Sequence, residues 1–129
     1  MDPIADMLSQ IQNASRVGKR SVKVPYSKHK MAIAEKLANV GYVESAEHKG
    51  QQPQKVIELT LAYDESGRGA VRGIERVSKP SRRFFEKAKN LQPFKHGYGR
   101  SLISSPVGIL TEDEAREQHV GGEILFRIW

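Results

Sequence analysis

Apolar residues at the start of the chain follow a helical period. Ile4, Met7, Leu8 and Ile11 fall at the i, i+3, i+4 and i+7 positions that share one face of a helix. Pro3 precedes them and suits the first helical position, because proline lacks only an N–H that would be unpaired there. The pattern predicts an amphipathic helix at the N-terminus.

A second helix is predicted after Ser27, whose side chain can cap the first turn, since Ile33, Leu37 and Val40 then recur at helical spacing. Alternating apolar residues predict strands around it. These strands cover residues 21–24, 42–47 and 55–63. The first half of the chain therefore reads helix, strand, helix, strand, strand.

The second half is predicted to be mainly β-structure with one short helix. Strands are expected at residues 71–79, 82–86 (irregular), 100–104, 107–110 and 124–129, with turns over 91–98. Thr111 and Glu114 match a capping box that begins the helix, and Gly121 and Gly122 are expected to end it. Because both faces of the last strand are largely apolar, that strand should be buried.

These elements place the chain in the α+β class, with two small subdomains. Residues 64–69 are small or polar, so they contribute little to a core and are the best candidate for a linker. We therefore expect an N-terminal subdomain over residues 1–64, a linker over 65–72 and a C-terminal, mainly β subdomain over 73–129.

Composition and charge favour an acidic partner. The 129 residues carry 21 basic and 15 acidic side chains, a net charge of +6. Such an excess favours nucleic acid over a neutral surface. The chain has no cysteine, so disulfides and thiolate metal sites are excluded. Acids near the N-terminus and the lack of a long apolar run argue against a signal peptide and a membrane span, so we expect a cytoplasmic protein.

The positive charge is concentrated between residues 66 and 100, which hold ten basic and two acidic residues, a net of +8. Residues 104–129 have the opposite balance, with two basic and five acidic residues, a net of −3. Four aromatic residues interleave with the basic segment, namely Phe84, Phe85, Phe94 and Tyr98. Of the adjacent pair, one ring is expected to face the core and the other the solvent. This composition is typical of a nucleic-acid surface, but it leaves RNA, DNA and acidic proteins open as partners.

Motifs for catalysis are missing. The chain has no P-loop, no Gly-x-Ser-x-Gly and no His-Glu-x-x-His, and its four histidines are scattered without metal-ligand spacing. The acids Asp2 and Asp6, and those at 112–114, could be offered as carboxylates of a metal-dependent nuclease. They are better interpreted as helix-start residues that interact favourably with the helix dipole. We predict no enzyme activity, no cofactor, no metal site and no small-molecule substrate.

The order of several segments resembles the bacterial-type small-subunit ribosomal protein eight family. The resemblance spans the chain and rests on Asp2-Pro-Ile-Ala-Asp-Met-Leu8, Ser27-Lys-His-Lys-Met-Ala-Ile-Ala34, Arg76-Val-Ser-Lys-Pro80, Ser104-Ser105, Gly108-Ile-Leu-Thr111, Glu114-Ala-Arg116 and Gly121-Gly-Glu-Ile124. It implies a structural protein that binds the central domain of small-subunit ribosomal RNA and helps assemble the platform. Implied partners are this RNA and neighbouring ribosomal proteins. Binding to its own messenger RNA, and an organellar rather than bacterial origin, stay open.

The resemblance also implies a set of RNA-binding residues. By matching position these are Ser104, Ser105, Gly108, Phe85, Gly121, Gly122 and Glu123, with Lys28, Lys30 and Lys79 as phosphate partners. We expect the glycines to let backbone approach RNA closely, and Glu123 to accept a hydrogen bond from a base amino group or a 2′-hydroxyl.

The chain departs from the family pattern at three places, one of them the first helix, where Gln10 and Gln12 stand at positions often held by arginines. The family's turn usually reads Ser-Thr-Ser-Lys-Gly, whereas this chain has Pro106 and Val107 at its third and fourth positions, and a tyrosine is usual where Phe85 stands. The turn therefore lacks one hydroxyl, one backbone N–H donor and one lysine, and Phe85 keeps a ring for stacking without the tyrosine hydroxyl. We predict that phosphate contact has moved to other cations, namely Arg82, Arg83, Lys87 and Arg100.

Two other functions remain as alternatives. The helices and strands of the first half also suit a general double-stranded RNA-binding module, which reads the shape of any duplex. An enzyme acting on nucleic acid is the other, although it lacks a supporting motif.

Overall fold

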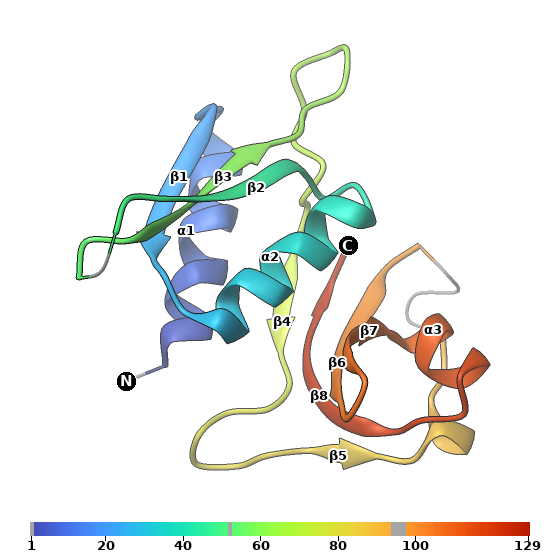
Figure 1. Cartoon of the computed structure of the whole chain (residues 1–129). Helices are drawn as coiled ribbons and strands as arrows, with labels where there is room; N and C mark the ends of the chain where they lie inside the picture. Colours follow the sequence, from blue (N-terminus) through green and yellow to red (C-terminus); the bar gives the residue numbers. More distant parts are fainter. Residues whose placement is uncertain (1, 52, 94–97) are drawn as a thin grey trace. The chain divides into compact units, whose positions relative to one another are not determined.

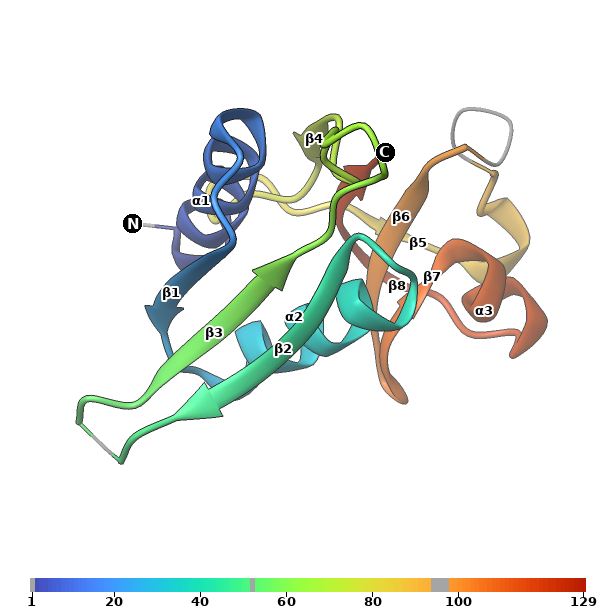
Figure 2. The same cartoon turned by 90° about the horizontal axis from the view of Figure 1, so that it is seen from above.

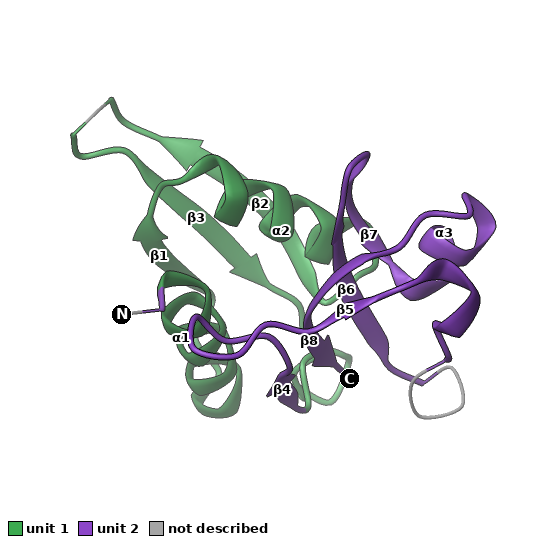
Figure 3. Ribbon diagram, turned by 90° about the horizontal axis from the view of Figure 1, so that it is seen from below, with its two compact units in different colours: residues 1, 3–72 green, residues 2, 73–129 purple. Residues whose placement is uncertain are grey.

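A computed structural model describes residues 2–51, 53–93 and 98–129. The chain divides into two compact units (Figure 3), unit 1 with residues 3–72 and unit 2 with residues 73–129, to which Asp2 is grouped. The predicted α+β class is confirmed. Residues 65–72 lie within unit 1. Their role as a linker between two subdomains stays a prediction.

Unit 1 is a three-stranded antiparallel sheet with two helices (Figure 2). Its elements are α1 (Pro3–Val17), β1 (Ser21–Pro25), α2 (Lys28–Asn39), β2 (Val43–Lys49) and β3 (Val56–Leu61). The strand order is β1-β3-β2, so the last strand lies in the middle of the sheet. The predicted order of helix, strand, helix, strand, strand is confirmed.

The predicted local signals account for these elements. The apolar face of α1 is buried through Met7, Leu8 and Ile11. Ser27 caps α2, because its hydroxyl accepts the backbone N–H of Lys30 at 3.1 Å. In β3, alternate residues are buried, as expected for a strand with one face on the core.

Unit 2 is built around its last strand (Figure 1). Its elements are β4 (Ile74–Arg76), β5 (Phe85–Glu86), the 3-10 helix η1 (Ala88–Asn90), β6 (Arg100–Ser105), β7 (Gly108–Thr111), α3 (Glu112–Glu117) and β8 (Gly122–Ile128). All described pairings are antiparallel. One edge of β8 pairs with β6, which pairs with β7, while the other edge pairs with β4 near the C-terminal end and with β5 near the N-terminal end.

The central place of β8 confirms that the last strand is buried. Leu125, Phe126 and Ile128 are buried, and Ile124 packs against the core cluster that contains Ile103. The predicted capping box is also confirmed, since Thr111 and Glu114 each accept the other's backbone N–H through their side chains.

Three predictions about unit 2 need correction. The strands expected at 71–79 and 82–86 shrink to three and two residues, because Pro80 lies in a tight turn closed by backbone hydrogen bonds between Lys79 and Arg82. Helix α3 ends at Glu117, well before the glycines expected to stop it. The left-handed residue after this helix is His119, with φ of 59°. Of the predicted turn over 91–98, residues 94–97 lie outside the described residues.

Within the described residues, no helix is both long and apolar enough to cross a membrane.

Candidate nucleic-acid interface

Three predicted site residues form a row across three neighbouring strands of unit 2. Glu123 of β8 lies opposite Ser104 of β6 on one edge and opposite Phe85 of β5 on the other. Directly opposite residues of antiparallel strands present their side chains on the same face of a sheet. We call Ser104, Glu123 and Phe85 the cross-strand row. Backbone pairing of β8 therefore brings together residues that are widely separated in sequence.

Arg83 is paired with the centre of this row. Its Nε and terminal nitrogen donate to the two carboxylate oxygens of Glu123 at 3.0 and 2.7 Å. The guanidinium carbon also lies 5.3 Å from the centre of the Phe85 ring, within the range of a cation–π contact. Hydrogen bonding to the carboxylate, and its charge, raise the pKa of Arg83 above the ordinary value. Glu123 and Arg83, predicted as separate RNA contacts, thus form one bidentate ion pair.

Arg82 and Phe84 form a second cation–π contact, one residue earlier in the chain than that of Arg83 and Phe85. The guanidinium carbon of Arg82 lies 5.1 Å from the centre of the Phe84 ring. Phe84 is 40% exposed and Phe85 is 64% exposed, so the expectation that one ring would enter the core is wrong. The reason is that β5 is only two residues long and pairs with β8 alone, at the margin of the sheet. Both rings are available to a partner.

A buried serine fixes the start of this aromatic segment. The Ser78 hydroxyl accepts the backbone N–H of Phe84 at 2.9 Å and donates to its carbonyl at 3.2 Å. The backbones of Lys79 and Arg82 exchange hydrogen bonds of 2.9 and 3.0 Å across the intervening turn. Two predicted phosphate contacts, Lys79 and Arg82, therefore flank the same turn, and both are exposed.

In the turn between β6 and β7, the side chain of Ser105, which was predicted to contact RNA, forms hydrogen bonds within the turn. The Ser105 hydroxyl donates to the Gly108 carbonyl at 2.8 Å and accepts the Val107 N–H at 3.3 Å. Gly108 has φ of 123°, a conformation that side chains rarely adopt. The turn is thus closed by Ser105 and Gly108, and Val107 is exposed at its tip.

Gly121 and Gly122 are required by packing inside the protein. A Cβ at Gly122 would lie 2.2 Å from the Ser104 carbonyl oxygen, and one at Gly121 would lie 2.4 Å from the Glu86 carbonyl oxygen. Either atom would push β8 away from its neighbours. The expected close approach of these glycines to RNA stays a prediction. Within the protein, the lack of a Cβ at both positions allows the close spacing of the strands that form the cross-strand row.

A surface groove with a volume of about 740 Å³ lies beside the row. Phe85, Lys87, Lys89, Asn90, His119 and Gly121 are among its lining residues. Lys87 was predicted as a contact, whereas Lys89, Asn90 and His119 were not. Lys89 lies in the basic run and could have been chosen from it. His119 is placed by its left-handed backbone after α3, for which the sequence carries no glycine signal.

Several predicted residues lie away from the row. Arg100 begins β6 opposite Ile128, four residues from Ser104, and donates to the Gly99 carbonyl at 3.1 Å. Lys28 is exposed on α2 of unit 1. Lys30 is only 6% exposed, which does not support the phosphate contact predicted for it. Burial lowers the pKa of Lys30, and the charge of Asp6 partly opposes this shift.

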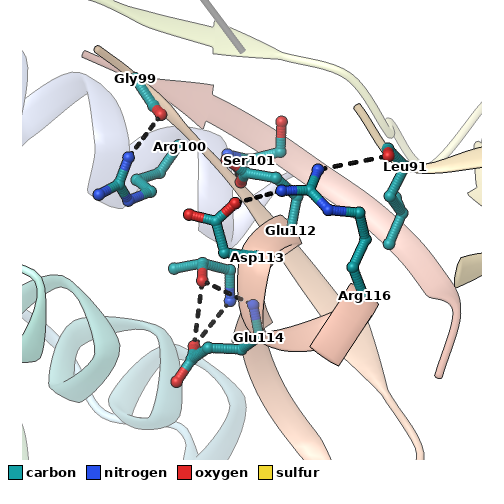
Figure 4. A network of polar contacts seen from close by, with 9 residues as sticks. Leu91, Gly99, Arg100, Ser101, Glu112, Asp113, Glu114 and Arg116 are labelled. Atoms are coloured by element: carbon teal, nitrogen blue, oxygen red, sulfur yellow. Dashed lines mark hydrogen bonds and ion pairs between the residues drawn. The ribbon is translucent and has the colours of Figure 1, made fainter. Parts of the chain in front are cut away.

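A buried carboxylate is hydrogen-bonded to the backbone of β6 (Figure 4). Glu112 is 1% exposed, and its Oε2 accepts the Ser101 N–H at 2.6 Å. Within the described part of the chain, Oε1 has no hydrogen-bond partner. Burial raises the pKa of Glu112, and the Ser101 hydrogen bond only partly offsets this effect. The residue was predicted only as a helix start; its burial depends on tertiary packing.

The described residues contain no group of three or more His, Asp or Glu side chains that could hold a metal ion.

An α+β chain with exposed rings, arginines stacked on them and a basic surface has the features of a nucleic-acid-binding protein. Comparison with known families narrows the class. The family model described as "Ribosomal protein S8" matches residues 2–129, so the chain belongs to the ribosomal protein S8 family.

Relatives agree over nearly the whole length. The small ribosomal subunit protein uS8 of Syntrophus aciditrophicus is 42% identical over 129 residues, which cover 99% of this chain and 97% of the relative. The protein of the same name from Bordetella avium is 44% identical, with 96% and 94% covered. That of Mycoplasmopsis pulmonis is 41% identical, with 99% and 96% covered. The family resemblance seen in the sequence is confirmed.

Proposed function

We propose that this chain is a structural component of the small ribosomal subunit that binds the central domain of its ribosomal RNA and helps assemble the platform. It acts without catalysis, in the cytoplasm, with neighbouring ribosomal proteins as further partners. Membership of the ribosomal protein S8 family supports the proposed place of the chain in the small ribosomal subunit. The cross-strand row carries the proposal of RNA recognition, because it joins an exposed ring, a carboxylate and a hydroxyl residue on one face.

The residues around the row divide the work of binding. Lys79, Arg82 and Lys87 are exposed cations that attract phosphates and position the protein. Phe85 offers a ring on which an unpaired base can stack, a contact worth about 1–3 kcal/mol. The Glu123 carboxylate, held in place by Arg83, accepts a hydrogen bond from a base amino group or a 2′-hydroxyl in this proposal.

The main competitor is a general double-stranded RNA-binding module. Such a module binds any duplex through phosphates and 2′-hydroxyls. We therefore expect the full chain to prefer an irregular helix from the ribosomal RNA central domain over a plain duplex of equal length by a large factor. Filter binding at one stated salt concentration measures this ratio. Equal affinity for both RNAs would contradict the proposal and favour the general module.

A pair of matched variants tests which face of the aromatic segment recognises RNA. Phe85→Ala should reduce affinity for the irregular helix by about ten- to a hundredfold, in line with the loss of one stacked base. Phe84→Ala is the control, because it removes a ring of the same kind from the adjacent position and leaves the cross-strand row intact. Both variants should bind a plain duplex as the unmodified chain does. An equal loss for both would show that the row does not carry recognition.

A further inference from the structure

A second basic region lies in unit 1, at the C-terminal end of α1. A shallow groove with a volume of about 280 Å³ is lined by Arg16 from the helix, by Arg68 and Arg72 from the loop after β3, and by Ser15. All three arginines are exposed. Over the described ranges, none of them forms an ion pair with a carboxylate. The groove therefore concentrates positive charge that carboxylates do not neutralise at contact distance.

The loop that carries two of these arginines is held in a fixed hairpin. One carboxylate oxygen of Asp64 accepts the Ser66 N–H at 2.9 Å, the Ser66 hydroxyl at 2.7 Å and the Arg68 N–H at 2.8 Å. Tyr63 and Gly69 form a β-bridge below these contacts. Hydrogen bonds from Ser66 and Arg68 lower the pKa of Asp64, and the charge of Arg72 lowers it further. One carboxylate oxygen of Asp64 is thus used to close the hairpin.

The hairpin is also attached to α1 at close range. The Tyr63 hydroxyl donates to the Lys19 carbonyl, and the Ser15 hydroxyl donates to the Val71 carbonyl at 3.4 Å. A Cβ at Gly69 would lie only 2.0 Å from the Ser15 hydroxyl oxygen, so a larger residue there would displace this hydroxyl. The attachment brings Arg68 and Arg72 beside Arg16, although more than 50 residues separate them from it.

The chemistry of the groove suits a phosphate group. Guanidinium groups bind phosphate oxygens with two parallel hydrogen bonds and remain charged at all relevant pH values. The groove is smaller than the sites that enclose nucleotide-sized ligands, which measure about 300–1,000 Å³. It has room for a single phosphate group, including one that belongs to a chain continuing outside the groove.

We propose that Arg16, Arg68 and Arg72 form a phosphate-binding site for the RNA backbone, which gives unit 1 an attachment point separate from the cross-strand row. This inference rests on the proposed function, because it takes the bound polyanion to be RNA. The site is sequence-independent: it positions the RNA, while the row in unit 2 reads it.

The test is a double variant with a matched control. Arg68→Gln/Arg72→Gln removes two charges from the groove and leaves the backbone hydrogen bonds of the hairpin in place. Arg20→Gln/Lys23→Gln removes two exposed charges from the start of β1 in the same unit. The slope of log affinity against log salt is measured with the central-domain RNA. We expect the slope to fall in magnitude by about 1–2 in the groove variant and to stay unchanged in the control.

Phosphate ethylation interference locates the contact. Ethylation at one or two phosphates should weaken binding of the unmodified chain, and this interference should disappear in the groove variant but persist in the control. Equal slopes in the two variants, or interference that persists in both, would overturn the groove proposal. Failure of the proposed function has a different signature, since the unmodified chain would then bind the irregular RNA and the plain duplex equally.

Discussion

Arginines occupy two exposed regions of this protein, and their surroundings differ. In unit 2, Arg82 and Arg83 each lie over a phenylalanine ring, and Arg83 is also paired with Glu123. In unit 1, Arg16, Arg68 and Arg72 share a groove and, within the described residues, have no ion-paired carboxylate. Arginines in the two regions thus have different contacts, and we expect them to contribute differently to RNA binding.

The difference follows from electrostatics. An arginine that already shares two hydrogen bonds with a carboxylate adds little net charge at longer range, but its position is fixed, and it fixes the carboxylate in turn. An arginine without such a partner keeps its attraction for phosphate, which falls with rising salt. The Arg83–Glu123 pair of unit 2 is therefore suited to short-range recognition, and the groove of unit 1 to sequence-independent attachment.

The largest expected effect comes from Gly122→Ala, which disrupts the row and leaves the groove unchanged. The added Cβ would meet the Ser104 carbonyl oxygen at 2.2 Å, so β8 and β6 must separate. Overpacking of this kind costs about 1–3 kcal/mol. Urea unfolding should show this loss of stability, and preference for the irregular RNA should disappear under conditions where the variant is still folded.

Val107→Ala is the control for that variant, because Val107 is exposed at the tip of the β6–β7 turn. Its stability should change by less than about 0.5 kcal/mol, as is usual at such surface positions. The salt dependence that we assign to the groove should persist in both variants. A folded Gly122→Ala protein that still prefers the irregular RNA would show that the spacing of the row is not needed for recognition.

Glu123→Gln tests the ion pair itself and makes Arg83 resemble the groove arginines. The amide keeps the shape of the side chain but no longer neutralises the guanidinium. Affinity for the irregular RNA should fall by about tenfold, the scale of one hydrogen bond to a charged group. Affinity for a plain duplex should rise, because Arg83 then attracts phosphate more strongly. Filter binding to the two RNAs measures both changes.

A second ion pair on β8 provides the comparison. Arg127 and Glu75 are 3.4 Å apart at the other end of the strand, away from the row. Glu75→Gln should therefore raise duplex affinity in the same way without loss of affinity for the irregular RNA. If the two variants behave alike towards both RNAs, Glu123 has no specific part in recognition.

Local patterns in the sequence predicted the elements better than the contacts between them. The first helix, the Ser27 cap and the Thr111–Glu114 capping box were found because each depends on residues within about four positions. The strands at 71–79 and 82–86 were predicted too long, because a turn closed by Lys79 and Arg82 interrupts them.

The site needed long-range information. The resemblance named Ser104, Glu123 and Phe85, but only strand pairing shows that they form one row. The Arg83–Glu123 pair joins residues 40 positions apart, and no local pattern indicates it. The groove was not predicted either, because it depends on a long-range contact. Residues 64–69 have the composition of a polar linker, and only the close approach of Gly69 to Ser15 places them beside α1.

The smallest expected effect concerns the buried carboxylate of Glu112, which should make the stability of unit 2 depend on pH. Burial raises the pKa of Glu112 above its ordinary value of 4.5, while Ser101 and Arg100 oppose this shift and Asp113 adds to it. A raised folded-state pKa means that the native state holds a proton which the unfolded state has released. The stabilising contribution of Glu112 is therefore present below pH 4.5 and is lost as the pH rises through the raised value.

Glu112→Gln should match the unmodified chain in acid and exceed its stability near neutral pH, because the amide oxygen can still accept the Ser101 N–H. Urea unfolding followed by fluorescence of Trp129, the one tryptophan of the chain and a residue of unit 2, measures this difference across pH. Glu117→Gln, exposed at the end of the same helix, should keep the pH dependence of the unmodified chain. If Glu112→Gln also keeps it, the buried carboxylate does not control this response.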